Sequence, residues 1–167
     1  MSEGRLFHHE CRAAGLVFKT CGDWMRWLED NKYDVHKAVA EHDGFKYNIN
    51  DVCVNPRVAI SYRIDNFYHF EVKVANTQYG WIWGYDITTY SSGSSCPASY
   101  PSRYDNKAVF FGSELEATLE GLRFIVEQLA TKARNPRASK VASLLNNAKK
   151  QLFNLVHPQM ELFPTNQ

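Results

Sequence analysis

Two side chains occupy positions from which they could carry out acid–base chemistry. His69 and Asp86 each occur in a run of alternating polar and apolar residues, which is typical of a strand with one buried face. His69 would project from the polar side with Glu71 and Lys73, and an imidazole titrates near neutral pH. Asp86, on the neighbouring strand, could serve as a carboxylate ligand of a metal nuclease. The two residues are the candidates for a small enzyme, although an exposed strand histidine is commoner and no second and third acid at suitable positions support a metal site at Asp86.

Other reactive residues form no specific pattern. The sequence holds no G-x-S-x-G, no Gly-Lys-Ser/Thr phosphate loop, no H-E-x-x-H and no G-x-G-x-x-G. Its four cysteines form no C-x-x-C pair. His8, His9 and Cys11, with Cys21 as a fourth ligand, could bind a metal, but free thiols also pack as small apolar groups. We therefore predict no metal site, no cofactor and no catalytic residues.

Composition is that of an ordinary globular protein. The chain has 167 residues, of which 44% are hydrophobic and 22% charged, so it can bury a core. Its formal net charge of +1 argues against an acidic DNA mimic and against a strongly basic nucleic-acid coat protein. The apolar run at 13–18 is too short for a secretory or membrane segment. We expect a cytoplasmic protein without a membrane partner.

Three alternating runs predict an antiparallel sheet. Residues 58–64, 68–74 and 79–88 have the strand period, and Asp65-Asn66 is suited to the tight turn between the first two. The serine-rich residues 90–107 read as a long loop, either functional or an insertion without structure. The prediction is a three-stranded antiparallel sheet that needs a cover on one side.

The third run has an aromatic face. Trp81, Trp83 and Tyr85 alternate along it and would point to the same side of the sheet. Such a row of rings can form a surface that binds a partner, or it can belong to the core. Both interpretations stay open at this stage.

Helical periodicity marks both ends of the chain. Residues 22–43 suggest two short helices, the second opened by Asp34 and closed by Gly44. Ser113 and Glu116 form a capping box, after which Leu115, Leu119, Leu122, Val126 and Leu129 make an apolar stripe. A final amphipathic helix should run from about residue 137 to Pro158.

These elements define an α+β protein. Its three-stranded antiparallel sheet would be covered by a C-terminal helix, with short N-terminal helices and the final amphipathic helix outside that unit. The corresponding division is an N-terminal helical segment (1–56), a sheet-plus-helix domain (57–134), and a C-terminal helix with a flexible tail (135–167).

Charge is uneven in the last third of the chain. Residues 131–150 contain no acid, and their six basic side chains are Lys132, Arg134, Arg137, Lys140, Lys149 and Lys150. A basic stripe of this size can neutralise several phosphates, which makes nucleic-acid binding one interpretation. The solvated face of an amphipathic helix is the other.

Two resemblances add to this pattern. The order of three strands and a helix over residues 57–130 resembles double-stranded-RNA-binding domains and small accessory proteins of phages and conjugative elements. The RNA-binding family implies lysines at the start of the helix, where this sequence has Glu114 and Glu116.

The C-terminal segment resembles the bacterial sliding-clamp-binding pentapeptide. It reads Gln159, Met160, Glu161, Leu162, Phe163. In that family the Leu-Phe pair would fill an apolar pocket, and the glutamine would hydrogen-bond at its rim. Alternatively, Leu162 and Phe163 fold back onto the core.

The sequence as a whole favours a binding protein over an enzyme. We expect a protein of a bacterium, phage or mobile element that acts around DNA replication, transfer or defence, through nucleic acid and a sliding clamp. One alternative is an inhibitor of a host nuclease or defence complex. The other is a small enzyme that uses His69 or Asp86.

Overall fold

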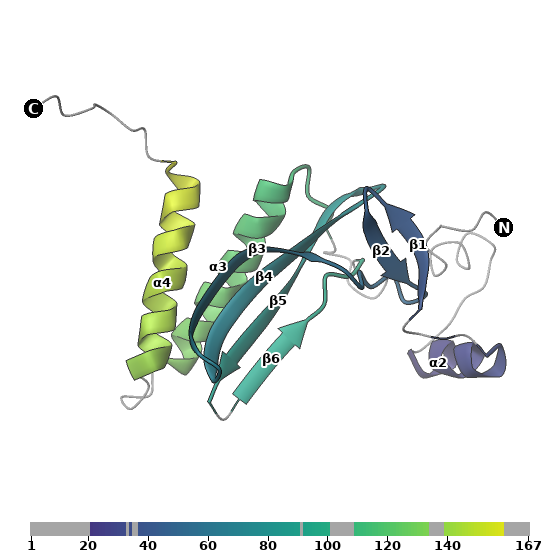
Figure 1. Ribbon diagram of the computed structural model, residues 1–167, viewed down its shortest axis with the longest axis horizontal. Helices are drawn as coiled ribbons and strands as arrows, with labels where there is room; N and C mark the ends of the chain where they lie inside the picture. Colours follow the sequence, from purple (N-terminus) through teal and green to yellow (C-terminus); the bar gives the residue numbers. More distant parts are fainter. Residues whose placement is uncertain are drawn as a thin grey trace, which may run out of the picture.

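The computed structural model describes residues 21–32, 34, 37–90, 92–100, 109–133 and 139–158. Two layers dominate it, a twisted sheet and a pair of helices, and a small hairpin lies at one end of the sheet (Figure 1). In chain order the elements are α2 (Cys21–Asp30), β1 (Ala38–His42), β2 (Phe45–Asn48), β3 (Arg57–Asp65), β4 (Tyr68–Thr77), β5 (Gly80–Thr89), β6 (Ser92–Cys96), α3 (Glu114–Lys132) and α4 (Ser139–Val156).

The main sheet is an antiparallel meander in the order β3-β4-β5-β6. The α+β class and the strands β3 to β5 confirm the sequence prediction, whereas the number of strands was wrong. Residues 92–96, predicted as part of a loop, form β6 and pair with β5 from Tyr85↔Cys96 to Thr89↔Ser92. The sequence Ser-Gly-Ser-Ser-Cys has no alternating pattern, so its periodicity did not predict a strand. The strand forms through backbone hydrogen bonds, which every residue type can make.

Both C-terminal helices cover the same face of this sheet. α3 packs on β4 and β5, and α4 packs beside α3 on β3 and β4. The core between the layers includes Phe70, Val72 and Val74 of β4 with Ile125 of α3 and Leu144 of α4. This two-layer packing explains the apolar alternation of β4 and confirms that a C-terminal helix covers the sheet.

The start of α3 is as predicted, but the buried face differs slightly. Ser113 Oγ accepts a hydrogen bond from the Glu116 N–H at 3.2 Å, and Glu116 Oε2 accepts one from the Gly112 N–H at 2.9 Å. Leu115, predicted in the apolar stripe, is 50% exposed. The helix instead turns Gly121 toward the sheet, where an added Cβ would lie 2.7 Å from Val72 Cγ1. The missing side chain lets α3 approach β4 closely.

The N-terminal part contains one of the two predicted helices. α2 matches the first, but residues 38–48 form the β1–β2 hairpin instead of a second helix. Asp43 and Gly44 both have positive φ, 49° and 79°, as a two-residue type I′ turn requires. The preference of Asp-Gly for this turn prevails over the weak helical spacing before it.

The hairpin builds a second, smaller core against the other face of the main sheet. Tyr47 and Ala40 pack with Ala75 of β4 and Ile82 of β5, and the Tyr47 hydroxyl donates to the backbone oxygen of Asn76 at 2.5 Å. Burial raises the pKa of Tyr47. Because the hairpin covers only one end, the rest of this face carries polar residues.

Candidate functional site

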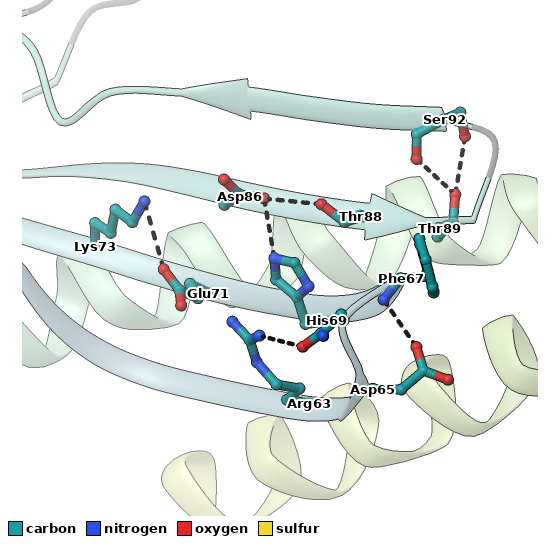
Figure 2. A network of polar contacts seen from close by, with 11 residues as sticks. Arg63, Asp65, Phe67, His69, Glu71, Lys73, Asp86, Thr88, Thr89 and Ser92 are labelled. Carbon is teal, nitrogen blue, oxygen red and sulfur yellow. Dashed lines mark hydrogen bonds and ion pairs between the residues drawn. The ribbon is translucent and has the colours of Figure 1, made fainter.

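The face of the main sheet away from α3 and α4 carries a network of charged side chains. Strand alternation requires this, because Phe70 and Val72 of β4 point into the helical layer, so His69, Glu71 and Lys73 point the other way. Figure 2 shows these side chains in front of the sheet with the helices behind it. Sequence reasoning predicted this polar side of β4 correctly.

Within this network the structure brings together the two candidate acid–base residues. His69 Nε2 lies 3.7 Å from Asp86 Oδ1, and Thr88 Oγ1 donates to the same carboxylate oxygen at 3.4 Å (Figure 2). The side chains of His69 and Asp86 are 16% and 31% exposed. Nε2 faces the carboxylate, and the buried Nδ1 has no hydrogen-bond partner in the described part of the protein. In this orientation neither ring nitrogen is presented to a substrate, so catalysis by this pair remains a prediction.

The remaining charges on the polar face balance one another. Lys73 Nζ lies 3.4 Å from Glu71 Oε2, and Arg63 stands opposite His69 on β3. Within the described residues no group of three or more His, Cys, Asp and Glu side chains is arranged to hold a metal ion. A face with balanced charges does not attract a polyanion as a whole.

A different kind of surface lies at the end of the sheet formed by the β3–β4 and β5–β6 turns. Phe67 and Tyr90, one from each turn, are 57% and 73% exposed, and their ring centroids are 5.8 Å apart. Tyr68 stacks on Tyr90 at 6.4 Å with an interplanar angle of 19°. The Tyr90 N–H donates to the Phe67 carbonyl oxygen at 2.7 Å and thereby joins the two turns.

Two of the predicted basic residues reach this end of the sheet. Lys132 at the end of α3 donates to Ser92 Oγ at 3.1 Å, and Lys140 at the start of α4 donates to Asp65 Oδ2 at 2.7 Å. The Lys140 ammonium also lies 5.1 Å from the Tyr68 ring centroid. Lys132 and Lys140 therefore border the exposed aromatic rings, although they are far from them in sequence.

Electrostatics at the Lys140 contact agree with this geometry. The hydrogen bond from Lys140 lowers the pKa of the Asp65 carboxyl, and the same bond raises the pKa of Lys140. Arg63, at the same end of β3, donates to the neutral Asn66 Oδ1 at 3.4 Å. We call the set Arg63, Phe67, Tyr90, Lys132 and Lys140 the turn surface.

The structure describes two of the four other predicted basic residues. Lys149 and Lys150 are exposed on α4, nine and ten residues beyond Lys140, which places them about 14 Å or more along the helix axis. Arg134 and Arg137 lie outside the described residues. The binding role of all four stays a prediction.

The aromatic row of β5 faces the helices. Trp83 and Tyr85 contact Phe124 of α3, with ring centroids 5.5 and 4.7 Å apart, and Arg57 lies 6.0 Å from the Trp81 ring. All three rings of the row pack against the main core and are partly buried. Their predicted contact with a partner would have to use the parts of the rings that α3 leaves accessible.

Sequence reasoning missed Phe67 of the turn surface, whereas Tyr90 belongs to the tyrosine-bearing loop 90–104 that the sequence indicated as a contact surface. Phe67 follows the predicted Asp65-Asn66 turn, and Tyr90 stands at the boundary of the predicted loop. A large apolar side chain at a turn, where polar residues are usual, was the available signal.

The proposed clamp-binding residues Gln159, Met160, Leu162 and Phe163 lie outside the described residues, as do His8, His9 and Cys11. α4 ends at Val156, two residues before the exposed Pro158. Within the described part of the chain no helix is long and apolar enough to cross a membrane. Comparison with known proteins gave no match: no family, no curated protein and no solved structure is similar to this chain.

Proposed function

We propose that this is a non-enzymatic binding protein of a bacterium, phage or mobile element, acting around DNA replication, transfer or defence, and that it contacts nucleic acid through the turn surface. One observation carries the proposal. Lys132 and Lys140 flank the connection between α3 and α4, and both reach the turns where Phe67 and Tyr90 are exposed. Cations next to exposed rings offer both phosphate and base contacts.

Charge at the turn surface supports an anionic ligand. Of its three cations, Lys132 and Arg63 bond to neutral oxygens, and among the described residues only Lys140 has a carboxylate partner. Asp65 is the one acid in the described parts of residues 63–69, 89–92, 130–133 and 139–142. Lys132 on the helical side of the sheet and Arg63 on its polar side can therefore each pair with a phosphate without displacing a carboxylate.

The test is the salt dependence of binding to a fluorescein-labelled DNA strand. Three phosphate contacts predict that log K falls with log salt with a slope of about −2 for a single strand. The Lys132→Gln/Lys140→Gln variant should reduce the slope to about −0.7, because one contact remains. Lys37→Gln/Lys46→Gln, which removes the same charge beside the β1–β2 hairpin, is the matched control and should leave the slope unchanged. A flat salt response of the unmodified protein would refute the proposal.

The same experiment decides how far the contact extends. Lys149→Gln/Lys150→Gln should make the slope less steep if nucleic acid follows α4, as the basic stripe predicts. An unchanged slope would confine the contact to the turn surface.

Recruitment to a sliding clamp is the second part of the proposal, and it rests on residues 159–163. α4 has 18 residues, about 27 Å, and its first turn lies at the turn surface. In the sequence, the clamp-like segment follows the other end of that helix.

Clamp binding is tested with purified bacterial clamp immobilised on a biosensor. Leu162→Ala/Phe163→Ala should abolish binding, because these side chains would fill the apolar pocket. Thr165→Ala, outside the pentapeptide, is the control. If a chain lacking residues 159–167 binds the clamp as well as the full chain, this part of the proposal fails.

A further inference from the structure

Exposed aromatic rings at the turn surface are paired rather than scattered. Phe67 and Tyr90 lie in contact, with their ring centroids 5.8 Å apart, and both are exposed. Single exposed apolar residues are normal on a protein surface and need no explanation. A contiguous group on two adjoining turns is a candidate contact surface.

The backbone conformation of Tyr90 is a second, independent indication that this residue belongs to a functional surface. Tyr90 has a φ of +34°, a conformation that a bulky side chain adopts only at a cost and that glycine adopts freely. The turn is held by the Tyr90–Phe67 backbone bond and by Thr89 Oγ1, which lies 3.0 Å from the Ser92 carbonyl oxygen. Because the Tyr90 ring is 73% exposed, burial in the core does not offset this cost. Strain of this kind is concentrated at functional sites.

Cations surround the rings on the side of the helices. Lys140 lies over the Tyr68 ring, which itself stacks on Tyr90, and Lys132 bonds to Ser92 in the turn that carries Tyr90. Rings flanked by positive charges match the way proteins bind single strands, whose unpaired bases stack on aromatic side chains while the backbone pairs with lysines. Bases of a duplex are stacked on one another and cannot make this contact without unpairing.

We infer that the turn surface binds single-stranded nucleic acid in preference to a duplex, with an unpaired base stacked on Tyr90 and Phe67. This inference rests on the proposed nucleic-acid function and names the class of its ligand. Arg63, Lys132 and Lys140 would pair with the phosphates on either side of the stacked base.

The variant Tyr90→Gly tests the contribution of the aromatic ring to binding separately from its contribution to folding. It removes the side chain but keeps a residue that suits the positive φ, so the melting temperature should stay the same or rise. Affinity for a fluorescein-labelled single strand should nevertheless fall about 5- to 150-fold, which corresponds to the loss of one base–aromatic stack. Affinity for the same strand within a duplex should change little.

A second variant and a control complete the experiment. Phe67→Ala should weaken single-strand binding in the same direction, and it decides the question if Tyr90→Gly does not fold. Phe153→Ala removes an aromatic residue that is 60% exposed near the other end of α4, and it should have no effect.

The outcomes distinguish this inference from the function it rests on. Equal affinity for single strand and duplex, unchanged in Tyr90→Gly or Phe67→Ala, would overturn the inference and leave the nucleic-acid function standing. Failure to bind either DNA at low salt would overturn both. A single-strand preference that both ring variants abolish supports the inference.

Discussion

Gly84 of β5 is a position at which one added methyl group should disrupt the fold severely. A Cβ there would lie 2.3 Å from the Ala98 backbone nitrogen and 2.5 Å from both the Cys96 oxygen and the Pro97 carbonyl carbon. After β6 the chain crosses β5 at this point on its way to the small core, where Ala98 and Tyr100 are buried. Only glycine leaves space for that crossing.

The magnitude follows from what would have to move. Overpacking that side chains can relieve costs about 1–3 kcal/mol. In Gly84→Ala all three obstructing atoms belong to the backbone, so no change of rotamer relieves the contact. We expect a loss of at least about 3 kcal/mol in the free energy of unfolding, at the upper end of that range. For a protein of this size, that loss lowers the melting temperature by about 6–12 °C.

Gly93→Ala in β6 is the matched control. A Cβ at Gly93 meets Ile87 O at 3.6 Å and Thr88 Oγ1 at 3.9 Å, which are ordinary contacts. Urea denaturation followed by circular dichroism should give a free energy of unfolding within about 0.5 kcal/mol of that of the unmodified protein. If Gly84→Ala and Gly93→Ala unfold at the same midpoint, the chain does not cross β5 at Gly84, and the reasoning is refuted.

Three further predictions concern single contacts. Tyr47→Phe should lower the free energy of unfolding by about 1–3 kcal/mol, because it leaves a half-buried backbone carbonyl oxygen of β4 without its donor; an unchanged urea midpoint would contradict the contact. Ser113→Ala should cost about 1 kcal/mol and Ser113→Gly only a few tenths, since glycine is a better N-cap than alanine; equal losses would argue against the cap. In an NMR titration the Asp65 carboxyl should have a pKa below its ordinary value of 3.8, and Lys140→Gln should bring it back up. Because the folded pKa is lowered, the contribution of this pair to stability is present above pH 3.8 and disappears as the pH falls through the pKa of folded Asp65. A titration curve identical in both proteins would exclude the ion pair in solution.

Local patterns in the sequence were sufficient for the centre of the fold. The alternation along residues 68–74 follows directly from the burial of Phe70, Val72 and Val74 under the helices, since neighbouring strand residues point to opposite faces. Ser113 and Glu116 marked the start of α3 because their hydrogen bonds span only three or four residues. Signals of this range are readable without a tertiary structure.

Elements with weak side-chain signals were missed. β6 is built from small polar residues and exists because β5 presents an unpaired backbone edge. The β1–β2 hairpin was mistaken for a helix because Ala38 and Val39 fit both periods, and the decisive signal was the Asp43-Gly44 turn that follows.

For the candidate site, too, some features could be predicted from the sequence and others depend on the tertiary structure. By itself the sequence determined which residues carry charge, that His69 belongs to the polar side of a strand, and that an acid-free basic stretch lies near the end of the chain. Tertiary structure alone decided that His69 lies against Asp86 and that Lys132 and Lys140 border Phe67 and Tyr90. The physical reason is range: periodicity reports what one element does with its own neighbours, whereas these contacts join two turns and two helix ends that meet only when the helical layer packs on the sheet.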